Sequence, residues 1–150
     1  MPSFFTTGKL DRNALRREVE DDAAGAVIVF EGTVRNHSDG RVGIVALEYE
    51  VKLPMADKLI ARILAETQLE IPFLKASISH KNGRAELREP TVIIAVSAAH
   101  RDEAYRASRR LIDRIKHEAP IWKREIFADG AGLWSEGCTA CAAQAIHAHP

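Results

Sequence analysis

The order of helices and strands along the chain constrains its fold more than any other sequence feature. Short apolar runs rich in β-branched and aromatic residues predict strands, and longer stretches with apolar residues every three or four positions predict helices. The elements are mixed without the regular strand–helix–strand alternation of a parallel sheet, which predicts an α+β fold with a mostly antiparallel sheet. Strands are predicted at 26–30, 44–51, 74–80, 84–87 and 91–97, and helices at 11–20, 54–69 and 101–118.

The predicted helices carry recognisable signals at their ends. Asp11 can cap the first helix, and Pro54 suits the first turn of the second. The third helix stops before Pro120, and the chain then continues through Trp122 and Lys123 as a further strand. A helix that leads directly into a strand holds its last side chains on rigid elements, as a site that binds anions requires.

Composition and charge describe one ordinary globular domain that spans residues 1–150. Hydrophobic residues make up 46% of the chain and charged residues 28%, a balance typical of folded domains. The 21 basic and 21 acidic residues cancel, which argues against a general nucleic-acid binder but permits a local basic pocket. No apolar run approaches the ~20 residues that span a bilayer, and the N-terminus lacks the regions of a signal peptide, so we expect a cytoplasmic protein.

A Cys-x-x-Cys pair, Cys138 and Cys141, lies near the C-terminus, followed by His147 and His149. A zinc site would need two histidines spaced by three to five residues, and a redox pair would open a helix after a strand. Neither context is visible in the sequence. We therefore interpret the segment after about residue 135 as a loosely ordered tail and expect neither a metal nor another cofactor. A metal-binding or redox protein built on the two cysteines stays open as an alternative.

Cationic side chains follow predicted elements at three separate places in the chain. They leave the end of the first long strand, the junction between the strand at 91–97 and the next helix, and the end of that helix. Strand ends and helix N-termini suit anions, because unpaired backbone N–H groups add to the side-chain cations. If the three places converge, they form a pocket for a phosphorylated or carboxylated small substrate; taken singly, each residue fits a turn, a cap or a solvated surface. These residues are Arg35, His37, His100, Arg101, Lys116 and Lys123.

Several short motifs occur in a fixed order between about Gly25 and Trp134. They are Gly25-Ala26, Glu31-Gly32-Thr33-Val34-Arg35-Asn36-His37, Leu47-Glu48-Tyr49-Glu50, Pro54-Met55-Ala56, His80 with Gly83, Ser97-Ala98-Ala99-His100-Arg101, and Lys116 with Ala119-Pro120-Ile121-Trp122-Lys123-Arg124-Glu125. Each piece alone is weak, whereas the ordered set is specific. In this set the chain resembles the large, catalytic subunit of molybdopterin synthase.

The resemblance implies a sulfurtransferase of molybdenum cofactor biosynthesis. Members of this family convert cyclic pyranopterin monophosphate (precursor Z) into molybdopterin by installing the two dithiolene sulfurs. The sulfur arrives as a thiocarboxylate on the C-terminal Gly-Gly of a small ubiquitin-like partner, whose tail enters a pocket of the large subunit. The large subunit forms the homodimer at the centre of a heterotetramer, and its fold is of the α/β-hammerhead type with two long packed helices.

The resemblance also assigns roles to individual residues. Lys116 matches the family lysine that lies against the partner's C-terminal carboxyl group, where it would stabilise the tetrahedral oxyanion formed during cleavage. Lys123 matches the second active-site lysine, with proton transfer or substrate positioning as its expected work. The expected substrate-binding set is Arg35, His37, His100, Arg101 and Glu125, in which Glu125 anchors one of the cations.

Two segments depart from the family pattern. Lys81-Asn82-Gly83 with Arg88-Glu89-Pro90 replaces the usual hairpin residues, and Val51-Lys52-Leu53 replaces a run that usually contains an aromatic residue. Neither change touches the two lysines, so we expect an active member. The alternative is a module that binds a ubiquitin-like partner without turnover.

Overall fold

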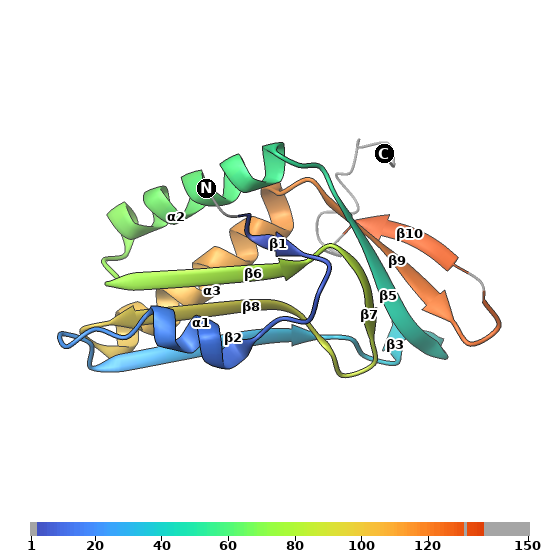
Figure 1. The fold of residues 1–150 in the computed structure, drawn as a ribbon, viewed down its shortest axis with the longest axis horizontal. Coiled ribbons are helices and arrows are strands. Elements are labelled where there is room, and N and C mark those ends of the chain that lie inside the picture. Colours follow the sequence, from blue (N-terminus) through green and yellow to red (C-terminus); the bar gives the residue numbers. More distant parts are fainter. Residues whose placement is uncertain (1–2, 131, 137–150) are drawn as a thin grey trace.

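The computed structural model describes residues 3–130 and 132–136, which form three helices and ten strands (Figure 1). Cys138, Cys141 and the expected tail from residue 137 onward lie outside the described residues, whereas residue 136 belongs to a strand. The helices are α1 (Arg12–Glu18), α2 (Met55–Glu70) and α3 (Arg101–Glu118). The strands are β1 (Phe5–Thr6), β2 (Ala26–Thr33), β3 (His37–Ser38), β4 (Arg41–Val42), β5 (Ile44–Val51), β6 (Lys75–Lys81), β7 (Gly83–Glu86), β8 (Pro90–Ala98), β9 (Ile121–Phe127) and β10 (Gly132–Glu136).

The strands form two four-stranded sheets and a small hairpin. The first sheet has the order β1-β6-β8-β2 and the second the order β10-β9-β5-β7, while β3 pairs with β4 alone. Every pairing is antiparallel except that of β1 with β6. The predicted α+β class with a mostly antiparallel sheet is therefore confirmed.

Strand β8 is the centre of the fold, because it is buried on both faces. Ile93 and Ala95 pack with Leu15 and Val19 under α1. The alternate residues of β8 belong to the main core on the opposite face, which α3 covers (Figure 1). A strand covered on both faces reads as a continuous apolar run, which is why 91–97 was recognisable in the sequence.

The two long helices pack against each other, as expected. Ala56, Ile60 and Ile63 of α2 are fully buried, as is Leu111 of α3. Ion pairs from α3 to α2 follow the same seam, such as the one between Arg114 and Glu66. This packing fixes the direction of α3, and therefore the position of its last turn beside the second sheet.

The predicted elements agree with the structure to within a few residues. Asp11 caps α1, since its side chain accepts hydrogen bonds from the backbone N–H groups of Asn13 and Ala14, each at 3.1 Å. The bounds of β5 and α3 are those expected, and Lys123 lies on a strand. Three elements were not predicted from the sequence, because they are short and lack a long apolar run: β1, the β3–β4 hairpin and β10.

Gly25 allows the entry into β2 to lie against the end of β8. A Cβ atom at this position would lie 2.3 Å from the carbonyl oxygen of Ala99. We expect Gly25→Ala to lower the free energy of unfolding by about 1–3 kcal/mol, because backbone atoms must move apart. Gly8→Ala is the matched control, since its Cβ would make only an ordinary contact of 3.6 Å. Urea denaturation checks this, and equal midpoints for the two variants would contradict it.

Candidate functional site

A pocket of about 360 Å³ lies where the end of α3, the face of β5 and β9, and the β3 strand meet. Its floor is buried and its walls carry the charged side chains. Lys116 and Arg35 are exposed on the walls, and Lys123 is half-buried. The described lining residues are Gly32, Thr33, Arg35, His37, Ser38, Ile44, Leu47, Tyr49, Thr91, Lys116, Lys123 and Glu125.

Strand register explains why two of the charged side chains share one face. Lys123 pairs with Tyr49 across β9 and β5, and Glu125 pairs with Leu47. Residues two apart on a strand point to the same side, and directly opposed residues do so as well. Lys116 comes to this face from the last turn of α3, where a cation also interacts favourably with the negative end of the helix.

Tyr49 and Thr91 form the polar part of the floor. They are 6% and 5% exposed, respectively, and their side chains are hydrogen-bonded to each other. Thr91 Oγ1 donates in turn to the carbonyl oxygen of Gly32, at 3.2 Å. Burial raises the pKa of Tyr49, with the hydrogen bond to Thr91 acting in the opposite direction, so the hydroxyl is neutral at physiological pH.

His80 lies beneath Tyr49 as a second buried layer. The two rings meet edge to face with centroids 5.0 Å apart, and Phe5 packs on the imidazole at 5.5 Å. His80 Nδ1 lies 2.8 Å from the carbonyl oxygen of Lys81, so Nδ1 carries the proton and donates it. Burial, aided by the charge of Lys116, lowers the pKa of His80 to about 4, although the Lys81 carbonyl acts against this shift. The site therefore rests on a neutral imidazole.

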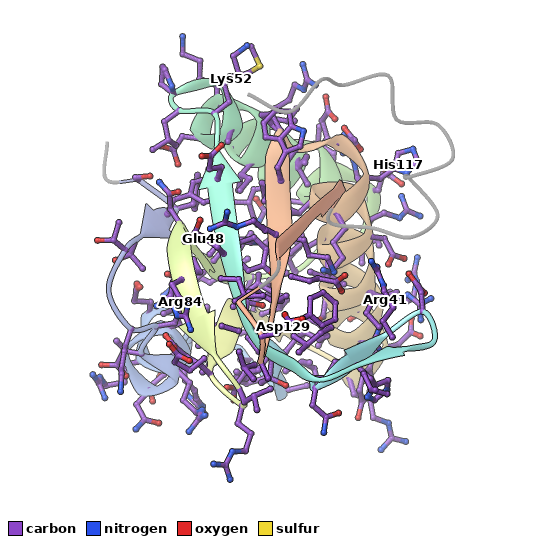
Figure 2. The ribbon with its side chains drawn as sticks, turned by 90° about the vertical axis from the view of Figure 1, so that its right-hand side faces the viewer. Arg41, Glu48, Lys52, Arg84, His117 and Asp129 are labelled. Atoms are coloured by element: carbon purple, nitrogen blue, oxygen red, sulfur yellow. The ribbon has the colours of Figure 1, made fainter. Side chains whose placement is uncertain are left out.

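Glu125 is a buried carboxylate in an otherwise cationic pocket. It is 2% exposed and accepts a hydrogen bond of 2.8 Å from Nη2 of Arg41. A charge of this kind is stable only when it is paired, and Arg41 supplies that pairing. Figure 2 places Arg41 at the β3–β4 hairpin, on the opposite side of the molecule from Arg84.

The structure brings together five of the seven predicted site residues. Lys116, Lys123, Arg35, His37 and Glu125 all line the pocket. They come from the loop after β2, from β3, from the end of α3 and from β9, so the predicted convergence of separate segments holds for them.

His100 and Arg101 are not part of this pocket within one chain. They lie at the start of α3, and Lys116 lies in its last turn. At 1.5 Å per residue, the 15 steps from Arg101 to Lys116 span about 22 Å. The side chain of His100 is 81% exposed and lies 3.4 Å from a carboxylate oxygen of Glu103. These two residues cannot join Lys116 around one small molecule unless another chain brings them there.

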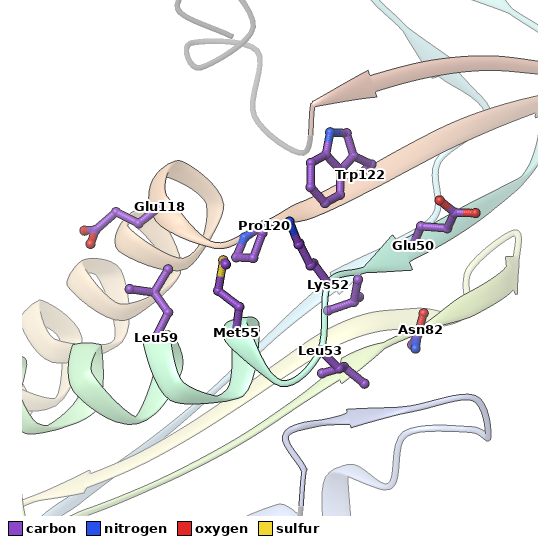
Figure 3. A pocket seen from close by; sticks show the side chains of 10 residues that line it. Glu50, Lys52, Leu53, Met55, Leu59, Asn82, Glu118, Pro120 and Trp122 are labelled. Carbon is purple, nitrogen blue, oxygen red and sulfur yellow. The ribbon is translucent and has the colours of Figure 1, made fainter. Parts of the chain in front are cut away.

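A larger hollow of about 680 Å³ lies where β5 passes into α2 (Figure 3). Trp122 lines it whereas Lys123 lines the cationic pocket, because successive side chains of β9 point to opposite faces. Among its described lining residues, the carboxylates of Glu50 and Glu118 outnumber the one cation, Lys52. An anionic substrate is therefore better matched to the smaller pocket.

The structure shows what surrounds the two segments that depart from the expected sequence pattern. Lys81, only 3% exposed, pairs with Glu89 at 2.6 Å and donates to the carbonyl oxygen of Gly8 at 3.0 Å. The hydrogen bond from Lys81 keeps the pKa of Glu89 below its usual value, although burial acts to raise that pKa. The two changed residues thus compensate each other across the turn. Residues 51–53 form part of the wall of the larger hollow.

Metal-ligating clusters and membrane-spanning helices were also sought among the residues that the structure describes. It contains no group of three or more His, Cys, Asp or Glu side chains that could hold a metal ion. None of its helices is long and apolar enough to cross a membrane. The two cysteines fall outside that part and are not tested by it.

Two residues of the pocket, Tyr49 and Thr91, and Arg41, which pairs with Glu125 of the pocket, were not predicted from the sequence. Tyr49 could have been found by pairing the predicted strand at 44–51 with the strand that carries Lys123. Arg41 was visible only as a member of a polar loop. The Asp39-Gly40 dipeptide before it is a strong hairpin signal, which would have placed Arg41 opposite Ser38.

Comparison with known proteins gives consistent matches over most of the chain. Residues 5–118 match the family described as MoaE protein. The molybdopterin synthase catalytic subunit of Thermoplasma volcanium is 47% identical over 111 residues, covering 74% of this chain and 80% of that protein. The subunit of the same name from Bacillus subtilis is 44% identical over 126 residues, covering 84% and 80%.

Solved structures give the same result. The crystal structure of molybdopterin synthase from Staphylococcus aureus superposes with a TM-score of 0.81 at 37% identity, covering 87% of this chain and 94% of that one. A complex of subunits 1 and 2 of the molybdopterin-converting factor from Helicobacter pylori superposes with a TM-score of 0.72 at 19% identity, covering 88% of each chain. This second match is a likeness of fold.

Proposed function

Because the chain belongs to the MoaE protein family, we propose that it transfers sulfur at the pocket that holds Lys116 and Lys123. It acts as the catalytic subunit of molybdopterin synthase, and its substrate is cyclic pyranopterin monophosphate. The sulfur donor is a small ubiquitin-like partner with a C-terminal thiocarboxylate. The observation that carries the proposal is the meeting of cations from three separate segments over one buried floor, in a chain with no net charge. The reaction is proposed to take place in the cytoplasm.

The two lysines lie on different elements and differ in exposure, which suits them to different roles. Lys116 comes from a helix end beside the pocket wall, where the partner's C-terminal tail can approach from solvent. Its ammonium group would stabilise the tetrahedral oxyanion that forms when water adds to the thiocarboxylate carbon and the carbon–sulfur bond breaks, leaving a carboxylate on the partner and the sulfur on the pterin. Lys123 is half-buried on β9 next to Tyr49, closer to the floor. It would position the pterin or move a proton to or from it.

Arg35 and His37 would hold the phosphate of the substrate. Both are exposed on the pocket wall and follow directly from the end of β2. A planar guanidinium can contact two phosphate oxygens at once, which a lysine cannot do. The floor of Tyr49 and Thr91 offers hydroxyl groups to the rest of the substrate, since both residues line the pocket.

His100 and Arg101 can serve the same substrate only from a second copy of the chain. The family resemblance assigns them to substrate binding, yet about 22 Å of helix separates Arg101 from Lys116 within one chain. The expected homodimer removes this conflict if the start of α3 of one copy lies over the pocket of the other. Each dimer would then contain two composite pockets.

Mixed dimers test this arrangement. Lys116→Ala and Arg101→Ala dimers are each expected to be inactive, but random exchange between them should restore about one quarter of the parent activity. Half of the dimers are then mixed, and each mixed dimer keeps one intact pocket. Lys116→Ala mixed with Lys123→Ala is the control, because both lysines come from the same chain and no pocket is intact. Turnover after subunit exchange is the measurement; no recovery in the first mixture would contradict the shared pocket.

The rival function is a module that binds the ubiquitin-like partner without turnover. Reconstitution separates the two: the purified chain, the thiocarboxylated small subunit and cyclic pyranopterin monophosphate are mixed, and molybdopterin is quantified as its fluorescent oxidation product. Product supports the synthase. A folded chain that binds the small subunit and forms no product would leave the docking module as the better account.

A further inference from the structure

The pairing of Glu125 with Arg41 raises a question about which of the two meets the substrate. Glu125 was expected from the sequence to belong to the substrate-binding set. The carboxylate is 2% exposed and lines a pocket whose proposed substrate is an anion. A carboxylate in direct contact with a phosphate would repel it, so Glu125 is poorly suited to contact that group itself.

Arg41 is better suited to contact the phosphate, because its side chain is cationic and partly exposed. Its side chain is 38% exposed, and Nη2 is its contact with Glu125. A guanidinium carries five N–H donors in a fixed plane, so one hydrogen bond to Glu125 leaves further donors for a second anion. The buried carboxylate holds one edge of this plane, and the rest of the guanidinium belongs to a side chain that is partly exposed next to a lining residue of the pocket.

Arg41 is not itself a lining residue, but the hairpin geometry places it beside two residues that are, Ser38 and Glu125. Ser38 and Arg41 are directly opposed in the β3–β4 pair, and opposed residues project to the same face of a hairpin. Ser38 is buried and lines the pocket. Asp39 and Gly40 between them have φ angles of 47° and 80°, the left-handed values of a tight two-residue turn. The short turn leaves the pair little freedom, so Arg41 stays beside the pocket wall.

We propose that Arg41 is a further substrate-binding residue of this site and that Glu125 is its positioning residue. The inference rests on the proposed function and extends it: the phosphate of the substrate is held by Arg41 in addition to Arg35. Glu125 acts through Arg41, by holding the guanidinium beside the pocket before the substrate arrives.

The competing explanation is a purely structural ion pair that ties the hairpin to β9. Four variants separate the two: Arg41→Met, Arg41→Lys, Glu125→Gln and the Arg41→Met/Glu125→Gln double variant. The matched control is Arg12→Met, which removes an arginine from a surface ion pair of similar length, 2.7 Å to Glu31; neither of these two residues lines the pocket. Each protein is measured for KM and kcat with cyclic pyranopterin monophosphate and for its unfolding midpoint.

We expect Arg41→Met to raise KM about tenfold or more with kcat changed less than threefold, and Arg41→Lys to raise it less. Glu125→Gln should raise KM in the same direction, and the double variant should add little to Arg41→Met, because both act through one guanidinium. Arg12→Met should keep the parent values. Parent-like KM in Arg41→Met, with only a lower unfolding midpoint, would overturn the inference and leave the proposed function standing. A parent without turnover would overturn both.

A second measurement needs no variant. Phenylglyoxal modifies accessible arginines, and mass spectrometry reports the modification of each one. Cyclic pyranopterin monophosphate should slow the modification of Arg41 at least several-fold and leave that of Arg12 unchanged. Equal modification of Arg41 with and without substrate would overturn its role in binding, whatever the variants do to folding.

Discussion

Lys116→Ala is expected to reduce the rate of molybdopterin formation by about 10²–10³-fold, the usual effect of removing one group that stabilises an oxyanion. Lys116 is exposed in the last turn of α3 and contributes little to the core. The variant should therefore fold with the parent's unfolding midpoint and still bind the small subunit. The loss should appear in kcat, since the interaction exists mainly in the transition state.

Two further variants are measured beside Lys116→Ala, one as a control and one as a comparison. Lys58→Ala removes an exposed lysine of α2 and should keep parent activity. Lys123→Ala should also lose activity but with a rise in KM, because the half-buried lysine is proposed to position the pterin. Turnover by Lys116→Ala above a tenth of the parent rate would contradict the role given to this residue.

His80 is expected to make the fold sensitive to mild acid. Its pKa is lowered from 6.5 to about 4 in the folded protein, chiefly by burial. Between these two values the unfolded chain binds a proton that the folded chain does not. The contribution of the neutral His80 to the free energy of unfolding is therefore fully present above about pH 6.5. It is lost as the pH falls toward 4, and the loss amounts to at most about 3 kcal/mol. The charge of Lys116 adds to this effect. The pKa of Tyr49, which packs on His80, is raised, so this side chain stays neutral over the same pH range and adds no charge beside the imidazole.

Urea denaturation at several pH values between 4.5 and 7 tests this prediction, with His80→Asn as the comparison. Asparagine does not titrate, and its amide N–H₂ can still donate to the Lys81 carbonyl that His80 contacts. The variant should be less stable than the parent at pH 7 and lose less stability on acidification. The lowered pKa of Glu89, caused mainly by Lys81, acts only below about pH 4.5 and is shared by both proteins. Parallel curves for the two proteins would contradict the buried neutral imidazole.

The sequence predicted the elements that build the core, for a physical reason. A strand such as β8, buried on both faces, must be continuously apolar, and α3 must present an apolar stripe to it. Both requirements produce apolar patterns within a single segment of the sequence, which can be recognised without knowing the fold. The hairpin of β3 and β4 is held by a turn and by the ion pair of Arg41 with Glu125, 84 residues apart in sequence, so no local apolar pattern marks it.

The same distinction separates the site residues that one segment of sequence predicts from those that require the pairing of distant segments. Lys116 and Lys123 flank one helix–strand junction, so sequence distance alone keeps them near each other. Tyr49 and Arg41 enter the site through strand register and through a long-range pair. The positions of His100 and Arg101 depend on a second chain in the proposed dimer, which no pattern within one chain can locate.

The most direct test of the central proposal follows the sulfur donor itself. The thiocarboxylated small subunit is incubated with cyclic pyranopterin monophosphate and either the parent or Lys116→Ala, and the mass of its C-terminus is followed by mass spectrometry. We expect the parent to convert the thiocarboxylate to a carboxylate only when the pterin is present, and Lys116→Ala to leave it intact over the same time. Conversion at equal rates by both proteins, or none by the parent, would contradict sulfur transfer at this pocket.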